Sequence, residues 1–233
     1  MIIWKLKHAI FQVRVQGLDQ LRTSLDEEPG GVLFLANHSS WWDFFMAHYL
    51  NSAVPVDGYG MTEHTNMLKF GFFRRIGAFS IDRNDPASIR ASIDYTAQLL
   101  KGPRSGVWVF PQGKIICNDV RPLQFQGGLR VLLAKAGRLK IVPTAIRYEF
   151  WQDERPEAFV RFGKPVWVDK SQRHTIIEDW QTRLTEELND LTHDALSQDS
   201  LRFASLLQGQ GSIHDRYARL KGWVFSHTEK SAP

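Results

Sequence analysis

The stretch Val32–Asp43, VLFLANHSSWWD, joins an apolar run to a group of polar and aromatic residues. Its first part, Val32–Ala36, is apolar throughout, which is typical of a strand buried on both faces of a sheet. The run follows the chain breaker EEPGG and leads directly into NHSSWWD. We therefore expect NHSSWWD at the carboxyl end of a central strand, where a helix begins near Trp41.

Strand-like and helix-like segments alternate along the rest of the chain. The further strands are expected at 54–59, 78–81, 106–110, 141–148 and 159–162. The helices are expected at 41–50, 66–76, 86–100, 128–136 and 174–196. Such alternation predicts an α/β fold with a mostly parallel central sheet flanked by helices. Ligands in such sheets bind beyond the carboxyl ends of the strands, and both NHSSWWD and FPQGK (110–114) fall there.

The two ends of the chain differ in composition from the middle. The first 22 residues place apolar side chains on one helical stripe, which predicts an N-terminal amphipathic helix over residues 1–25. This helix would either lie in a membrane interface or pack on its own domain. We assign the main domain to residues 26–197 and a C-terminal extension to 198–233, in which RYARLKGWVF is basic and aromatic.

Composition narrows the class of protein and its partners. The 233 residues include one cysteine, Cys117, so an internal disulfide and a cysteine-cluster metal site are ruled out. No apolar stretch approaches the roughly 20 residues of a membrane-spanning helix, and lysines interrupt the start MIIWKLKHAIF, so we expect a cytoplasmic protein. A formal net charge of +4 favours an acidic carrier protein, nucleic acid or an anionic membrane surface. Nucleic acid is not expected, because no dense Lys/Arg cluster is interleaved with stacking aromatics.

His38 and Asp43 are the residues best suited to catalysis. A histidine can remove the proton of an attacking hydroxyl, and a carboxylate on its other ring nitrogen fixes the tautomer. Their separation of five residues places His38 just before a helix and Asp43 within its first turns. Two alternatives remain open from spacing alone. Ser40 and Asp43 also resemble a helix-capping box, and a hydrolytic metal site could use His38 and Asp43 with His48 and His64, although these lack a recognisable ligand spacing and we expect no metal.

Two further segments could contact a substrate. In GAFSIDR, Arg83 follows a predicted strand and could bind phosphate or carboxylate in bidentate fashion. In FPQGK, Pro111 and Gly113 would shape a tight turn that exposes backbone amides and the Gln112 side chain. On spacing alone, a solvated arginine and an ordinary strand-ending turn are the preferred interpretations of these segments.

Four blocks taken in order resemble the glycerolipid acyltransferases, a family that includes bacterial lysophosphatidic acid acyltransferases. NHSSWWD resembles the NHxxxxD motif, GAFSIDR the GxxxxxR-type acceptor motif, FPQGK the FPEGT motif and IVPTAI the closing VPxAI block. The resemblance covers approximately residues 31–146 and rests on the order and spacing of all four motifs. Gln112 departs from the family pattern, because the usual residue there is glutamate.

The resemblance implies an acyltransferase domain that moves a fatty acyl group from acyl-CoA or acyl carrier protein to a lipid hydroxyl, with 1-acylglycerol-3-phosphate as one candidate acceptor. His38 would be the general base, Asp43 its orienting carboxylate and Arg83 the binder of acceptor phosphate. The other substrate-binding residues would be Phe110, Pro111, Gln112, Gly113 and Lys114. The family needs no cofactor beyond its thioester co-substrate, and we expect peripheral association with the cytoplasmic face of a membrane.

Two alternatives follow from the departure at Gln112. The acceptor could be a glycolipid, a carotenoid glycoside or another lipid alcohol instead of a phosphate-bearing lipid. The chain could also be a peripheral lipid-binding protein that keeps the scaffold without turnover. Dependence of thiol release on His38 separates catalysis from binding.

Overall fold

A computed structural model describes residues 2–151 and 153–209 of the chain. The strands in these residues are β1 (Gln12–Gln16), β2 (Val32–Ala36), β3 (Asp57–Glu63), β4 (Ala78–Ile81), β5 (Ser105–Val109), β6 (Arg138–Glu149), β7 (Glu157–Phe162), β8 (Val166–Asp169) and β9 (Ala204–Gln208). The α-helices are α1 (Ile2–Ala9), α2 (Leu18–Glu27), α3 (Asp43–Leu50), α4 (His64–Lys69), α5 (Pro86–Leu99), α6 (Gly128–Ala136) and α7 (Ile176–Leu196). Short 3-10 helices are η1 (Gly71–Ile76), η2 (Lys170–His174) and η3 (Ser200–Arg202).

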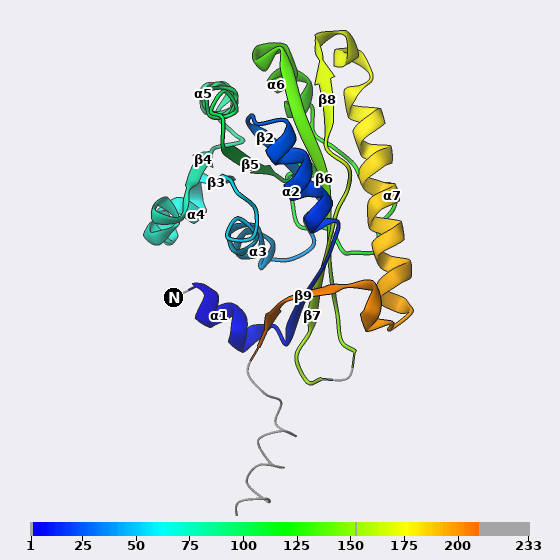
Figure 1. Cartoon of the computed structure of the whole chain (residues 1–233). Coiled ribbons are helices and arrows are strands. Elements are labelled where there is room, and N and C mark those ends of the chain that lie inside the picture. The colour runs from blue at the N-terminus through cyan, green and yellow to red at the C-terminus, as the bar shows by residue number, and fades with distance from the viewer. Residues whose placement is uncertain (1, 152, 210–233) are drawn as a thin grey trace, which may run out of the picture.

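The strands form one mixed sheet in the order β4-β3-β5-β2-β6-β7-β1-β9, and β8 pairs with β6 beyond the end of β7. The strands β4, β3, β5, β2 and β6 run parallel to one another. β7 and β8 run antiparallel to β6. The expected α/β class with a mostly parallel sheet flanked by helices is therefore confirmed (Figure 1).

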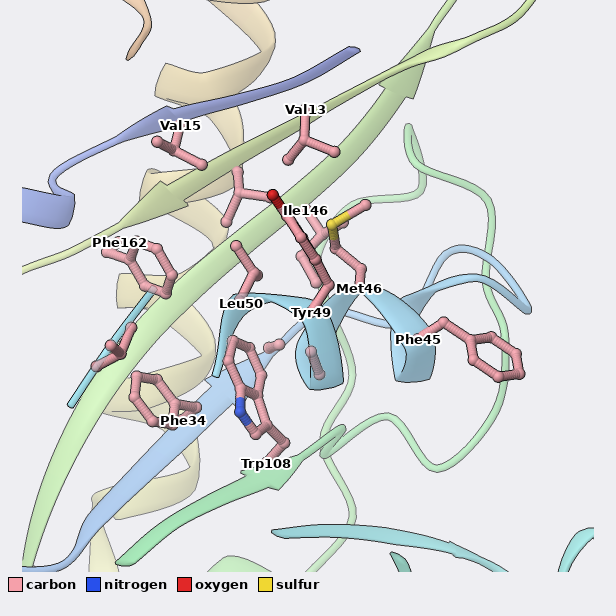
Figure 2. Packing of buried hydrophobic residues seen from close by; sticks show 14 of the residues in the cluster. Val13, Val15, Phe34, Phe45, Met46, Tyr49, Leu50, Trp108, Ile146 and Phe162 are labelled. Atoms are coloured by element: carbon pink, nitrogen blue, oxygen red, sulfur yellow. The ribbon is translucent and has the colours of Figure 1, made fainter. Parts of the chain in front are cut away.

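Helices cover both faces of the sheet, as the unbroken apolar sequence of β2 predicts. Val32, Phe34 and Ala36 pack toward α1, α2 and α3, whereas Leu33 and Leu35 pack toward α5 and α6. All five are fully buried. On the first face, the rings of Phe34 and Trp108 are stacked with centroids 4.5 Å apart, near Leu50 and Met46 of α3 (Figure 2). This packing fixes the end of β2 and the start of α3 relative to each other.

The N-terminal region differs from the single amphipathic helix expected over residues 1–25. It contains α1, then β1, then α2, and β1 pairs with β7 and β9 in the sheet. The pattern QVRVQ in β1 alternates with period two, and Val13 and Val15 are buried, so the period of a strand interrupts the helical stripe. Leu6 and Ile10 are also buried, which shows that α1 packs on its own domain.

The C-terminal region also contributes to the sheet. β9 lies within the extension expected over 198–233 and pairs antiparallel with β1. The basic and aromatic segment RYARLKGWVF lies outside the described residues. Within the described residues, no helix is long and apolar enough to cross a membrane.

Candidate active site

The site forms where two neighbouring parallel strands end. β2 leads into NHSSWWD and β5 leads into FPQGK, and Leu35 pairs with Val109 at the carboxyl ends of both strands. Asn37 closes this edge, because its buried side chain donates to the Ile146 carbonyl at 2.8 Å and accepts from the Ile146 amide at 2.7 Å. The turn that follows β2 is thereby tied to β6.

His38 and Asp43 lie in hydrogen-bond contact, with His38 Nδ1 2.8 Å from Asp43 Oδ2. A carboxylate only accepts, so Nδ1 carries a proton and Nε2 is left as the basic nitrogen of the ring. Asp43 is fully buried, whereas the His38 side chain is 22 % exposed. The pair therefore consists of a fixed carboxylate behind an imidazole that faces open space.

Four donors surround the Asp43 carboxylate. Oδ2 accepts from the backbone amides of Ser39 and Ser40 at 2.6 and 2.8 Å as well as from His38. Oδ1 accepts from the Tyr148 hydroxyl at 2.8 Å. The amides of Ser39 and Ser40 belong to the turn before α3, whose N-cap residue is Trp42 and has no side-chain capping bond, so Ser40 and Asp43 do not form the alternative capping box.

Tyr148 was not among the residues selected from the sequence. It lies near the end of β6, and its burial raises the pKa of the hydroxyl well above its usual value, with the Asp43 charge acting in the same direction. The hydroxyl therefore stays protonated and donates to Asp43 near neutral pH. A tyrosine near the end of an apolar strand gives no sequence signal of this contact.

The FPQGK segment, which follows β5, contacts His38, which follows β2. Gln112 is buried, and its Oε1 accepts from the His38 backbone amide at 2.6 Å. The Phe110 ring stacks on the imidazole with centroids 4.7 Å apart. Gly113 has a φ of 70°, a conformation that favours glycine, and its carbonyl accepts from Arg83.

A cavity of about 470 Å³ opens in front of His38. The predicted site residues Arg83, Phe110, Pro111 and Gly113 line it together with His38. Most of its remaining wall is apolar and comes from β3, β4, β5, α5 and α6, including Met61, Ile81, Ile89, Ile93, Val109, Leu129 and Leu132. This volume lies in the range of small-molecule sites.

Gln112 and Lys114 do not line that cavity, in contrast to the expectation that they contact the acceptor. They line a smaller neighbouring hollow, together with Ile116 and Val120. The Gln112 side chain instead holds the backbone of His38, because its buried Oε1 accepts from the His38 amide.

Glu63 is a second residue that the sequence did not single out. It ends β3 and lines the cavity, and its Oε2 accepts from Arg83 Nε at 2.6 Å. The Arg83 guanidinium therefore contacts a carboxylate and the Gly113 carbonyl at the rim of the cavity. Among the described residues, no group of three or more His, Cys, Asp or Glu side chains could hold a metal ion, so His48 and His64 do not form a metal cluster with the pair.

Comparison with known proteins identifies the family of the chain. Residues 12–147 match the model of a family described as Acyltransferase. No curated protein matches the chain. The matched range contains His38, Asp43, Arg83 and the FPQGK segment.

Proposed function

The chain belongs to the acyltransferase family that includes the glycerolipid acyltransferases, and on that premise we propose that it transfers a fatty acyl group from a thioester carrier to a lipid hydroxyl, with His38 as the general base. The observation that carries this proposal is the His38–Asp43 contact at the wall of a largely apolar cavity. A hydroxyl and an acyl chain could be held there next to a basic nitrogen.

The chemistry needs one proton transfer and one exchange of bonds. His38 Nε2 accepts the acceptor hydroxyl proton as its oxygen attacks the thioester carbonyl carbon. The tetrahedral intermediate collapses, the C–S bond breaks, and the leaving thiolate takes the proton from the imidazolium. Asp43 stabilises the imidazolium and keeps the ring oriented, while Tyr148 and two backbone amides hold Asp43. The donor would be acyl-CoA or acyl carrier protein, and no other cofactor enters these steps.

The apolar part of the cavity is suited to the acyl chain. Its walls come from β5 and from the facing sides of α5 and α6, which include Ile93, Val109 and Leu132. Burial of each methylene group stabilises the bound chain by about 0.8 kcal/mol, so the depth of this wall would select chain length.

Two classes of acceptor suit the polar rim. Arg83 favours a phosphate-bearing acceptor such as 1-acylglycerol-3-phosphate, which would make the chain a 1-acylglycerol-3-phosphate O-acyltransferase of phospholipid biosynthesis. Glu63 favours a hydroxyl-rich head group, as in a glycolipid or a carotenoid glycoside, because its carboxylate already pairs with Arg83 and would repel a phosphate. In either case the acceptor is a lipid, so we place the protein at the cytoplasmic face of a membrane.

The first test is acceptor-dependent thiol release. Acyl-CoA and acyl carrier protein donors would be combined with lysophosphatidic acid, glycolipids and other lipid alcohols. We expect His38→Ala to lower the rate at least about 100-fold, since general base catalysis contributes on that order. The matched control is His174→Ala, because His174 is exposed and lies on η2, away from the cavity. If the folded His38→Ala variant kept the wild-type rate, or if the wild type released no thiol while it bound lipid, the non-catalytic lipid-binding alternative would replace this proposal.

The acceptor class is tested at Glu63. Glu63→Gln removes the charge that competes for Arg83 while it keeps a similar shape. For a phosphate acceptor the variant should lower KM about tenfold, because one unfavourable charge contact is lost. For a hydroxyl-rich acceptor the same variant should raise KM, since a charged hydrogen-bond acceptor is lost. An unchanged KM for both acceptor classes would exclude Glu63 from acceptor binding.

A further inference from the structure

The segment between β3 and β4 is basic and aromatic and contains no acidic residue. It comprises α4 and η1, and it carries Lys69, Arg74 and Arg75 on the surface. None of these three cations has a carboxylate within ion-pair distance among the described residues. Other exposed cations of the described residues, such as Arg104 and Arg173, also have no such partner, but here three cations lie in one short segment without an acidic residue. The positive charge of this segment is therefore free to meet an anionic partner.

Apolar side chains are interleaved with these cations. Leu68 is 68 % exposed and Trp41, which precedes α3, is 46 % exposed. Phe70 is half-buried, and the centroid of its ring is 6.2 Å from that of Trp41. Phe72 is half-buried too and stacks on Phe45, with centroids 6.3 Å apart. Exposed apolar groups on a packed aromatic base are typical of a surface that meets lipid.

This surface continues into the cavity of the candidate active site. Trp41 lines the cavity with His38, and Asn66 of α4 and Phe73 of η1 do so as well. In Figure 1, α4 lies beside β3 and β4 at the rim of the sheet. A molecule resting on the segment would therefore be next to the cavity wall.

We propose that the surface formed by Leu68, Lys69, Phe70, Phe72, Arg74, Arg75 and Trp41, here called the 68–75 surface, docks onto an anionic lipid bilayer. The cations contact the headgroups, and Leu68 and the aromatic edges enter the interface. This inference rests on the proposed function, because a lipid acceptor would pass from the bilayer into the cavity along Trp41. The exposed apolar side chains favour a bilayer over an acidic carrier protein as the partner.

The test is binding of the full chain to phosphatidylcholine vesicles with and without 30 mol % phosphatidylglycerol, measured by flotation. The variant Lys69→Gln/Arg74→Gln/Arg75→Gln should bind the anionic vesicles on the order of 100-fold more weakly, since each cation contributes about fivefold near such a surface. Leu68→Ser should weaken binding about tenfold in a manner that added salt does not change. Neither change touches a residue that lines the cavity.

The matched control is Lys101→Gln/Arg104→Gln/Arg173→Gln, which removes the same charge. These three exposed side chains lie near the amino end of β5 and after β8, at the edge of the sheet opposite to the site. The control should bind vesicles as the wild type does. Equal losses in the two triple variants would overturn the proposal, because the effect would then come from net charge.

The following results distinguish a failure of this inference from a failure of the proposed function. Thiol release with a short-chain, water-soluble acceptor should be unchanged in the 68–75 triple variant. Vesicle binding that depends on the surface, in a chain that releases no thiol with any acceptor, would support the surface and overturn the catalytic proposal alone. A triple variant that binds vesicles normally but loses turnover with acyl carrier protein only would overturn the bilayer proposal and assign the surface to the carrier.

Discussion

The hydroxyl of Tyr148 is one of four donors to the Asp43 carboxylate, and its removal is the first test at the scale of one residue. Tyr148→Phe removes the donor to Asp43 Oδ1 and leaves the ring in place. Because a hydrogen bond to a charged group contributes about 1.5–3 kcal/mol, we expect a loss in kcat of about tenfold or more and a lower free energy of unfolding. Steady-state thiol release and urea unfolding measure the two effects.

Tyr49 provides the control for this prediction. Its hydroxyl donates to the Leu206 carbonyl at 2.9 Å, away from the cavity. Tyr49→Phe should lower the free energy of unfolding by about 1 kcal/mol and leave kcat unchanged. If both variants lowered kcat equally, the contact with Asp43 would have no specific role in turnover.

The sequence allowed half of this residue-scale network to be predicted. His38 and Asp43 are close in the chain, so their spacing around a helix start indicated that they meet. Tyr148 and Glu63 reach the site from other strands, and only the order of strands in the sheet decides which distant residues become neighbours. The hydrogen bond from the His38 amide to Gln112 could not be predicted for the same reason, because the two residues follow different strands of the sheet.

At the scale of an element, α3 carries a histidine whose charge is coupled to folding. Partial burial lowers the pKa of His48 below its usual value, and a hydrogen bond to the backbone of Ile76 opposes the shift. The unfolded chain therefore binds a proton more readily than the folded chain as pH falls below about 6.5. The free energy of unfolding is therefore not reduced by His48 well above that pH, and it falls on acidification as His48 of the unfolded chain takes up a proton.

His48→Gln should make the pH dependence of stability shallower between pH 7 and pH 5. Urea midpoints across this range measure the effect, and the difference between wild type and variant isolates His48 from the carboxylates. His174→Gln is the control, since His174 is exposed on η2. Parallel curves for wild type and His48→Gln would contradict the assignment.

The strands β2, β4, β5, β6 and β7 were predicted from their apolar residues, but β1, β8 and β9 were not predicted and β3 was not placed correctly. The apolar run suggested a strand at 54–59, whereas β3 covers Asp57–Glu63. Its sequence DGYGMTE is poor in apolar residues, because the strand passes close to α3. A Cβ at Gly60 would lie 2.6 Å from the Phe44 ring, and one at Gly58 would lie 1.7 Å from the Asn51 amide. Because close packing against α3 leaves no room for a Cβ at these two positions, both are glycines. Glycine is rare inside strands, so the sequence of β3 does not have the pattern from which a strand is predicted.

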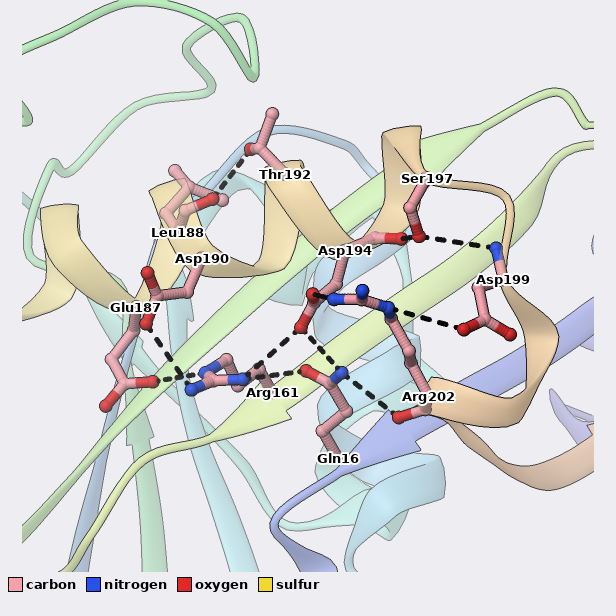
Figure 3. A network of polar contacts seen from close by, with 10 residues as sticks. All are labelled: Gln16, Arg161, Glu187, Leu188, Asp190, Thr192, Asp194, Ser197, Asp199 and Arg202. Atoms are coloured by element: carbon pink, nitrogen blue, oxygen red, sulfur yellow. Dashed lines mark hydrogen bonds and ion pairs between the residues drawn. The ribbon is translucent and has the colours of Figure 1, made fainter.

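At the scale of the whole molecule, the two end regions of the described chain complete the sheet together. β1 is held between β7 and β9, and the Gly209 amide donates to the Phe11 carbonyl at 2.6 Å. Figure 3 shows a polar network that connects the same region to α7. In it, Asp194 accepts from Gln16 Nε2 at 2.9 Å and from the Arg202 guanidinium at 2.5 Å. Period and composition did not reveal this pairing, because β1 and β9 are distant in sequence.

This arrangement predicts that β9 is part of the cooperative fold. A chain that ends at Phe203 lacks β9, and it should be less stable by about 3–5 kcal/mol than one that ends at Gly209, because the buried Leu207 and several ladder hydrogen bonds are lost. It should also self-associate, since the unpaired edge of β1 becomes a template for another chain. Urea unfolding and gel filtration of the two chains measure these effects. Equal urea midpoints and a monomeric shorter chain would show that the sheet is stable without β9, and that β1 is held by β7 and the α7 network alone.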